Sequence, residues 1–112
     1  MNLQDKHIKD WFASDITDAI KGGICSPKEI AQSYIDFVRT TDSGIDAWVQ
    51  FEESVILKDI DEGINQEGSL AGVPLAVKDV FNTKDYMTQM GSGIWKGFTP
   101  GNNARVIDHI LW

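Results

Sequence analysis

Lys78 is the residue of this chain whose type and position most clearly suggest chemistry. It stands near the end of an apolar run that begins at Val73, and Asp79 follows it directly. Burial disfavours an ammonium group and lowers the pKa of a lysine, so a desolvated lysine can act as a general base near neutral pH. The alternative is a lysine that ends a strand and extends its amine to solvent. No hydroxyl nucleophile for such a base is evident in the sequence.

The segments around Lys78 are predicted to form helices and two strands. Ser14 is the expected N-cap of a first helix that ends at Gly22-Gly23. Ser26 and Glu29 form a capping box around Pro27 and predict a second helix that runs to Arg39. Apolar spacing predicts two more helices, at 52–66 and at 104–111, the last one capped by an asparagine at 102–103.

The two predicted strands cover residues 47–51 and 73–80. The first is short, aromatic and β-branched. The second lacks strict alternation of apolar and polar residues, which indicates burial on both faces, as in the interior of an α/β sheet. Residues 81–102 have the composition of a loop. The pattern therefore predicts an α/β fold with a helical lead-in.

Composition limits the classes of function that this chain can have. The 112 residues fit one domain, and the net charge of −7 argues against a general affinity for nucleic acid. A single cysteine, Cys25, excludes an intrachain disulfide and a cysteine-rich zinc site, and His7 and His109 lack metal-ligand spacing. The N-terminus is polar and no window is apolar enough to span a membrane, so we expect a cytoplasmic protein without a secretory signal.

An ordered set of short motifs resembles the amino-terminal part of the amidase signature family. The motifs follow one another in the family's order and spacing, and they cover most of residues 70–111. They are Leu70-Ala71-Gly72-Val73-Pro74-Leu75-Ala76-Val77-Lys78-Asp79-Val80-Phe81-Asn82-Thr83, Thr88-Gln89-Met90-Gly91-Ser92, Gly97-Phe98-Thr99-Pro100 and Ala104-Arg105-Val106-Ile107. The resemblance is weaker over residues 14–67, where the capped helix at Ser26-Pro27 is compatible with the family.

The resemblance implies both a fold and a mechanism. Members of the family are α/β proteins with a large mixed sheet flanked by helices, and they cleave small-molecule amides with a serine, a second serine in a cis peptide, and a lysine. Lys78 matches that lysine and would accept a proton through the bridging serine. The reaction needs no metal and no organic cofactor. It requires burial to lower the pKa of the amine by several units from about 10.4.

This sequence departs from the family's pattern in one respect. The glycine- and serine-rich segment that carries both serines has no counterpart here, and Gly91-Ser92 matches the Gly-Ser that follows the lysine strand instead. We therefore expect residues 1–112 to be the amino-terminal part of a single amidase domain, truncated before that segment and inactive alone. Met90, Gly91 and Ser92 are the candidate substrate-binding residues, and Met87 and Trp95 line either a substrate pocket or the core.

Three interpretations of the function remain open. Val80-Phe81-Asn82-Thr83 favours a general amidase over the A subunit of a tRNA-dependent amidotransferase. A nucleic-acid partner is expected only in the second of these. The third interpretation is a non-catalytic remnant, or a subunit that acts by association, suggested by the acidic surface and the apolar last helix. The oligomeric state and the particular amide are not specified by the sequence.

Overall fold

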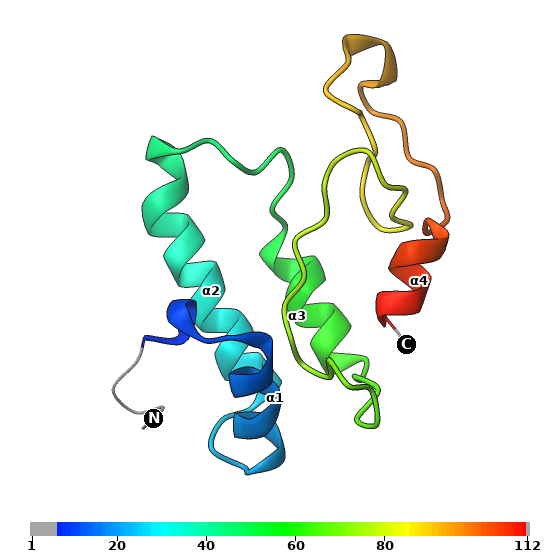
Figure 1. The fold of residues 1–112 in the computed structure, drawn as a ribbon. Helices are drawn as coiled ribbons and strands as arrows, with labels where there is room; N and C mark the ends of the chain where they lie inside the picture. The colour runs from blue at the N-terminus through cyan, green and yellow to red at the C-terminus, as the bar shows by residue number, and fades with distance from the viewer. Residues whose placement is uncertain (1–6, 112) are drawn as a thin grey trace. The chain divides into compact units, whose positions relative to one another are not determined.

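The computed structural model describes residues 7–111 as two compact units (Figure 1). The first unit contains the chain up to Trp48 and the segment Glu52–Pro74, and the second contains Val49–Phe51 and the chain from Leu75 onwards. The polar segment 1–6, in which we expected no secretory signal, lies outside the described residues. Each unit is described by itself below.

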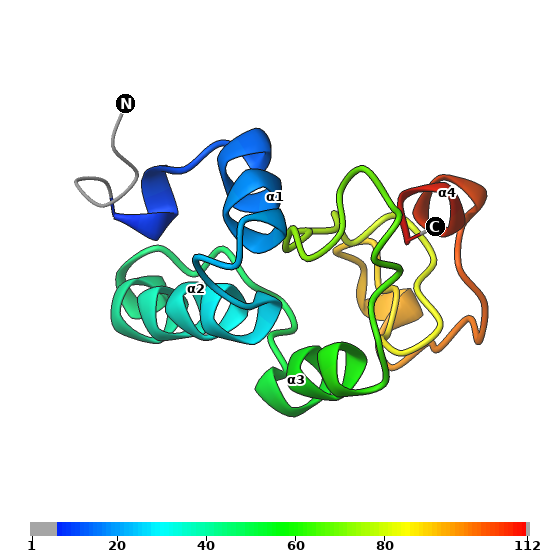
Figure 2. The same cartoon turned by 90° about the horizontal axis from the view of Figure 1, so that it is seen from below.

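The first unit is helical and is organised around its longest helix, α2. Apolar side chains at helical spacing on α1 and α2 form its buried core, which consists of Ile16, Ala19, Ile30, Ala31 and Ile35. Helix α2 packs against α3 and against two 3-10 turns, η2 and η3 (Figures 1 and 2). The elements are η2 (Ile8–Asp10), α1 (Ala13–Lys21), α2 (Pro27–Thr41), η3 (Asp42–Gly44) and α3 (Glu53–Asp61).

The predicted capping box at the start of α2 is confirmed. The Glu29 backbone N–H donates to Ser26 Oγ at 3.2 Å, and the Ser26 N–H donates to Glu29 Oε2 at 2.7 Å. These two bonds satisfy N–H groups that have no partner inside the helix. The Ser26 N–H, and to a smaller extent the Ser26 side chain, lower the pKa of the Glu29 carboxyl. Helix α2 extends two residues beyond the predicted end at Arg39.

The prediction that Ser14 caps α1 is wrong. The helix begins at Ala13, with Phe12 as the N-cap residue, because the Asp15 carboxylate accepts a hydrogen bond from the Phe12 N–H at 2.8 Å. Ser14 lies inside the first turn, where its carbonyl accepts from the Thr17 hydroxyl at 3.0 Å. The start of the helix is therefore determined by Asp15, three residues after the N-cap residue, and not by Ser14.

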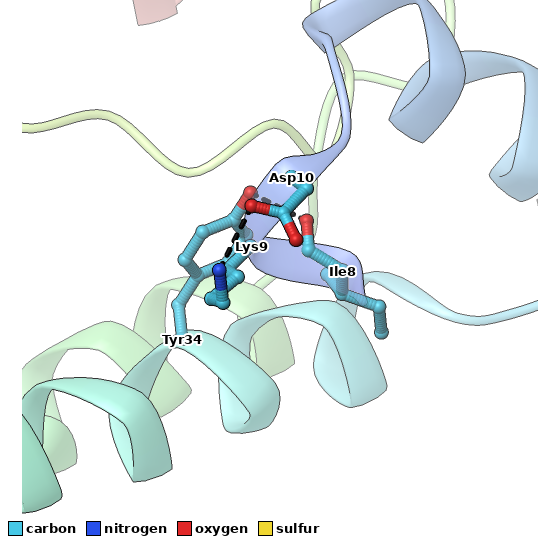
Figure 3. A network of polar contacts seen from close by, with 4 residues as sticks. All are labelled: Ile8, Lys9, Asp10 and Tyr34. Atoms are coloured by element: carbon cyan, nitrogen blue, oxygen red, sulfur yellow. Dashed lines mark hydrogen bonds and ion pairs between the residues drawn. The ribbon is translucent and has the colours of Figure 1, made fainter. Parts of the chain in front are cut away.

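Two groups of polar contacts join elements of the first unit to α2. The Tyr34 hydroxyl donates to the Ile8 carbonyl at 3.1 Å and so ties η2 to α2, while Lys9 pairs with Asp10 at 2.9 Å (Figure 3). Burial, and to a smaller extent the Asp10 carboxylate, raises the pKa of the Tyr34 phenol. Ion pairs between Arg39 and Glu53 and between Lys28 and Asp61 connect α2 to α3. The second pair is exposed on both sides, so it contributes little to stability.

Both predicted strands are wrong as descriptions of this structure, because residues 7–111 contain no β-strand. Segments 47–51 and 73–78 are irregular, and Asp79 and Val80 form a turn. An isolated strand leaves its backbone groups unpaired, so it is not stable without neighbouring strands. Helix α3 also ends at Asp61 rather than at residue 66, and Gly63 follows with a φ of +110°.

The second unit is mostly loop, as predicted for residues 81–102. It contains one 3-10 turn, η4 (Gly93–Trp95), and α4 (Arg105–Leu111), which confirms the predicted last helix. Asn103 does not cap α4 through its side-chain oxygen, because that oxygen accepts from the Lys84 N–H at 2.8 Å. None of the helices described between residues 7 and 111 has the length and apolar character needed to cross a bilayer.

Gly72 occupies a position of the first unit that requires glycine for two reasons. Its φ is +82°, a region that side chains rarely adopt, and it belongs to a turn in which the Val73 N–H donates to the Leu70 carbonyl at 3.0 Å. A Cβ atom at this position would also lie 2.4 Å from Ile20 Cδ1 and 3.2 Å from Pro27 Cγ. The turn before the lysine segment therefore packs closely against α1 and the start of α2.

Replacing Gly72 with alanine tests this close approach, with Gly23→Ala as the matched control. Gly23 also has a positive φ, of +69°, but has no atom within 4 Å of its virtual Cβ. Gly23→Ala should cost about 1 kcal/mol from backbone strain alone, and Gly72→Ala about 1 kcal/mol more, because the Pro27 ring is rigid although the end of the Ile20 side chain can turn aside. Chemical denaturation of the 112-residue chain measures both. Equal losses would show that the contact with Ile20 and Pro27 is not tight.

The capping box predicts a pH dependence of stability. Because the folded-state pKa of Glu29 lies below its ordinary value of 4.5, its contribution is complete above that pH and disappears as the pH falls through the lowered pKa. The advantage of the wild type over Glu29→Gln should therefore be constant near neutral pH and vanish on acidification. Denaturation midpoints across this range measure it, with Glu67→Gln as the control. A wild-type advantage that persists in acid would contradict the assignment.

Candidate functional site

Lys78 stands at the start of a turn in the second unit, and its side chain is exposed. The Lys78 carbonyl accepts hydrogen bonds from the Val80 N–H at 2.7 Å and from the Phe81 N–H at 3.2 Å, so the backbone folds back directly after the lysine. The expectation that residues 73–80 bury the amine inside a sheet is wrong for this structure. Leu75, for example, keeps 47% of its surface exposed. The apolar run is present, but residues 7–111 do not cover it.

Asp79 links the lysine turn to a loop ten residues away. Its Oδ1 accepts a hydrogen bond from the Gln89 backbone N–H at 2.9 Å. This bond therefore joins Asp79 to a segment that is distant in the sequence. The Gln89 side chain continues the connection, because its Oε1 accepts from the Gly97 N–H at 3.2 Å.

Thr88 strengthens the same connection from the interior of the unit. It is 1% exposed, its hydroxyl donates to the Phe81 carbonyl at 3.3 Å, and its N–H donates to the Phe98 carbonyl at 2.8 Å. The turn that begins at Lys78 is thus held at Asp79 by Gln89 and at Phe81 by Thr88. Sequence reasoning missed this role of Thr88, because nothing in the local pattern indicates that the residue is buried.

Gln50 holds the neighbouring residue Met87 through both of its backbone groups. The Gln50 side-chain amide donates to the Met87 carbonyl at 2.7 Å and accepts from the Met87 N–H at 2.9 Å. The Gln50 side chain therefore forms a pair of hydrogen bonds with the Met87 backbone, as the backbone of a neighbouring strand would. This contact accounts for the assignment of residues 49–51 to the second unit, where sequence analysis predicted a strand.

The three candidate substrate-binding residues form a tight turn of their own. Met90 and Gly91 have φ values of +54° and +66°, and the Ser92 N–H donates to the Gln89 carbonyl at 2.9 Å. Two successive positive φ values with this bond are typical of a type I′ turn. The Ser92 hydroxyl accepts from the Ile94 N–H at 3.3 Å at the start of η4. The turn therefore adjoins Gln89, which binds Asp79.

The apolar side chains near this turn are largely open to solvent. Met87, Met90 and Trp95 keep between 37% and 43% of their surface exposed, and the Trp95 and Phe98 rings pack edge to face with centroids 5.2 Å apart.

Cys25 belongs to the first unit. Burial, with a smaller effect from Glu29, raises the pKa of its thiol, which makes the thiolate less available.

Comparison with known proteins gives one family. A family model described as Amidase matches residues 29–111. The A subunit of glutamyl-tRNA(Gln) amidotransferase from Tropheryma whipplei is 38% identical over 109 residues, which cover 92% of this chain and 21% of that protein. The mitochondrial A subunits of Homo sapiens and of Canis lupus familiaris are each 31% identical over 103 residues, which cover 87% of this chain and 19% of the relative.

The matched region is one part of a longer protein in each of these relatives. The chain spans about a fifth of the length of the curated relatives that it matches. No solved structure matches it.

The buried Thr88 hydroxyl provides a test of the connection described above. Thr88→Val keeps the shape of the side chain but removes the bond to the Phe81 carbonyl, so local opening of the loop should become easier by about 1 kcal/mol. The matched control is Thr99→Val, because the Thr99 hydroxyl is exposed and lies 3.5 Å from the Gly97 carbonyl. Amide hydrogen exchange at Gln89 and Phe98 measures the effect. Equal exchange rates in both variants would contradict the assigned role.

Proposed function

The chain belongs to the amidase family, and we propose that it supplies the lysine base of an active site that cleaves carboxylic amides. The observation that carries this proposal is the position of Lys78 in the first of the ordered motifs, inside the matched segment 29–111. Asp79 and Gln89, which hold the turn of Lys78, lie in the same segment. We assign residues 1–112 to the amino-terminal part of a single amidase domain.

The proposed reaction requires two serine hydroxyls from the rest of that domain. Lys78 takes a proton from the bridging serine, which takes one from the nucleophilic serine as its oxygen bonds to the amide carbon. The proton returns by the same route to the nitrogen as the carbon–nitrogen bond breaks, and water then releases the acyl group. No step of this proposed reaction requires a metal or an organic cofactor.

The proposed role requires a desolvated amine, and Lys78 is exposed in this structure, so we propose that the rest of the domain covers it. The apolar residues around it are suited to being covered. Leu75, Val80 and Phe81 each keep more than 40% of their surface exposed, and apolar surface of this extent is characteristic of an interaction site. We propose that residues 73–78 join the mixed sheet of the complete amidase domain, where neighbouring strands would supply their missing hydrogen bonds, and that the turn at Asp79 and Val80 ends this strand.

Two functions are compatible with this proposal. The domain is either a general amidase that acts on a small amide or the A subunit of a tRNA-dependent amidotransferase. The three relatives described above all carry the second name, which favours that candidate, while residues 80–83 favour the first. In both cases we assign Met90, Gly91 and Ser92 to the substrate side of the site, because their turn adjoins Gln89.

A chimera tests the role of Lys78. In it, the matched segment of this chain replaces the corresponding part of the Tropheryma whipplei relative, and release of ammonia from carboxylic amides is measured. Lys78→Ala should lower kcat by about 10³-fold or more. Lys78→Arg should fail as well, because a guanidinium group does not give up its proton in proteins. The 112-residue chain alone should have no activity.

Lys84→Ala is the matched control for this experiment, because Lys84 is an exposed lysine six residues further along the same unit. It should leave kcat unchanged. Turnover close to that of the unmodified chimera in Lys78→Ala would refute the assignment of the base. A chimera that folds but has no activity before any substitution would show that this chain cannot supply the lysine base.

A further inference from the structure

The Asp79 carboxylate has one feature that packing of the turn does not explain. Its Oδ1 accepts from the Gln89 N–H, whereas its Oδ2 is buried and receives no hydrogen bond from the described residues 7–111. A buried acceptor without a donor costs about 1–3 kcal/mol, and more if it is charged.

Asp79 connects the lysine turn to the loop that contains Thr88 and Gln89. Asp79 follows Lys78 directly, and its side chain reaches the Gln89 backbone. Two residues further on, the Phe81 carbonyl accepts from Thr88, the residue before Gln89. The backbone of Lys78 therefore cannot rotate freely, because the segment that follows it is held at two points by consecutive residues of one loop.

We propose that Asp79 is a positioning residue for Lys78, holding the lysine turn against the Thr88–Gln89 loop so that the amine projects in one direction. The proposal rests on the function assigned to Lys78 above. Effective proton transfer requires the base within hydrogen-bond reach of its partner, so a turn free to rotate would lower the rate even with the amine intact. The acid acts through the lysine and does not itself exchange protons with the substrate.

The test uses the complete 112-residue chain, labelled with ¹⁵N, and needs no catalytic assay. Asp79→Ala removes the acceptor, and exchange of the Gln89 amide should accelerate at least about tenfold. The backbone order parameter at Lys78 should fall from a rigid value toward about 0.6 or below. Asp79→Asn keeps an oxygen for Gln89 and should restore both values. Asp85→Asn, which changes an exposed acid of the same unit, is the matched control and should change neither.

The outcomes separate a positioning role from a purely structural one. Wild-type values of both quantities in Asp79→Ala would overturn the proposal. Faster exchange at Gln89 with an unchanged order parameter at Lys78 would also overturn it, because Asp79 would then hold the loop without fixing the lysine. If Asp79→Ala also loses protection from hydrogen exchange at the buried Ile107 amide, the variant has unfolded more widely than the loop. The scalar coupling through the hydrogen bond, between the Gln89 nitrogen and Asp79 Cγ in the wild-type chain, then decides. Its presence supports the proposal and its absence overturns it.

The chimera adds a kinetic readout that distinguishes this proposal from the assignment of the base. Asp79→Ala should lower kcat about tenfold or more while KM changes little. An effect confined to KM would contradict positioning. If Lys78→Ala retains turnover while Asp79→Ala still frees the Lys78 backbone, the proposed function fails and the structural link between Asp79 and Lys78 stands.

Discussion

The hydrogen bond from the Gln89 N–H to Asp79 Oδ1 is the contact on which the arrangement of the second unit depends. It joins the lysine turn to the loop that contains Gln89, and the Thr88 hydroxyl repeats the connection at Phe81. Because this unit has few buried apolar side chains, Ile107 among them, directional bonds between backbone and side chains fix its shape. Gln50 serves the same purpose at Met87.

Local signals in the sequence predicted the helices well and the strands poorly. The capping box at Ser26 fixed the start of α2 because both of its bonds lie within four residues. A strand depends on partners that are distant in sequence, and residues 73–80 have none within 7–111. The same limit applies to the site. The motif predicts Lys78 as a site residue, but its link to Gln89 spans ten residues and leaves no local pattern.

The exposure of Lys78 and the apolar character of its neighbours are consistent with each other. Segment 73–80 has the composition of a buried strand, while Leu75, Ala76 and Val80 remain exposed to solvent. The chain also spans about a fifth of its curated relatives. We therefore regard the exposed surface around Leu75 and Phe81 as the face that the rest of an amidase domain covers.

The most direct test is a crystal structure of the chimera with the Tropheryma whipplei relative. We predict that residues 73–78 form a strand between neighbours, that Lys78 is buried, and that Lys78 Nζ lies about 2.6–3.2 Å from a serine hydroxyl, with the turn at Asp79 and the Asp79–Gln89 bond retained. A folded chimera in which Lys78 remains in solvent, beyond the reach of any serine, would contradict the assignment of Lys78 as the base.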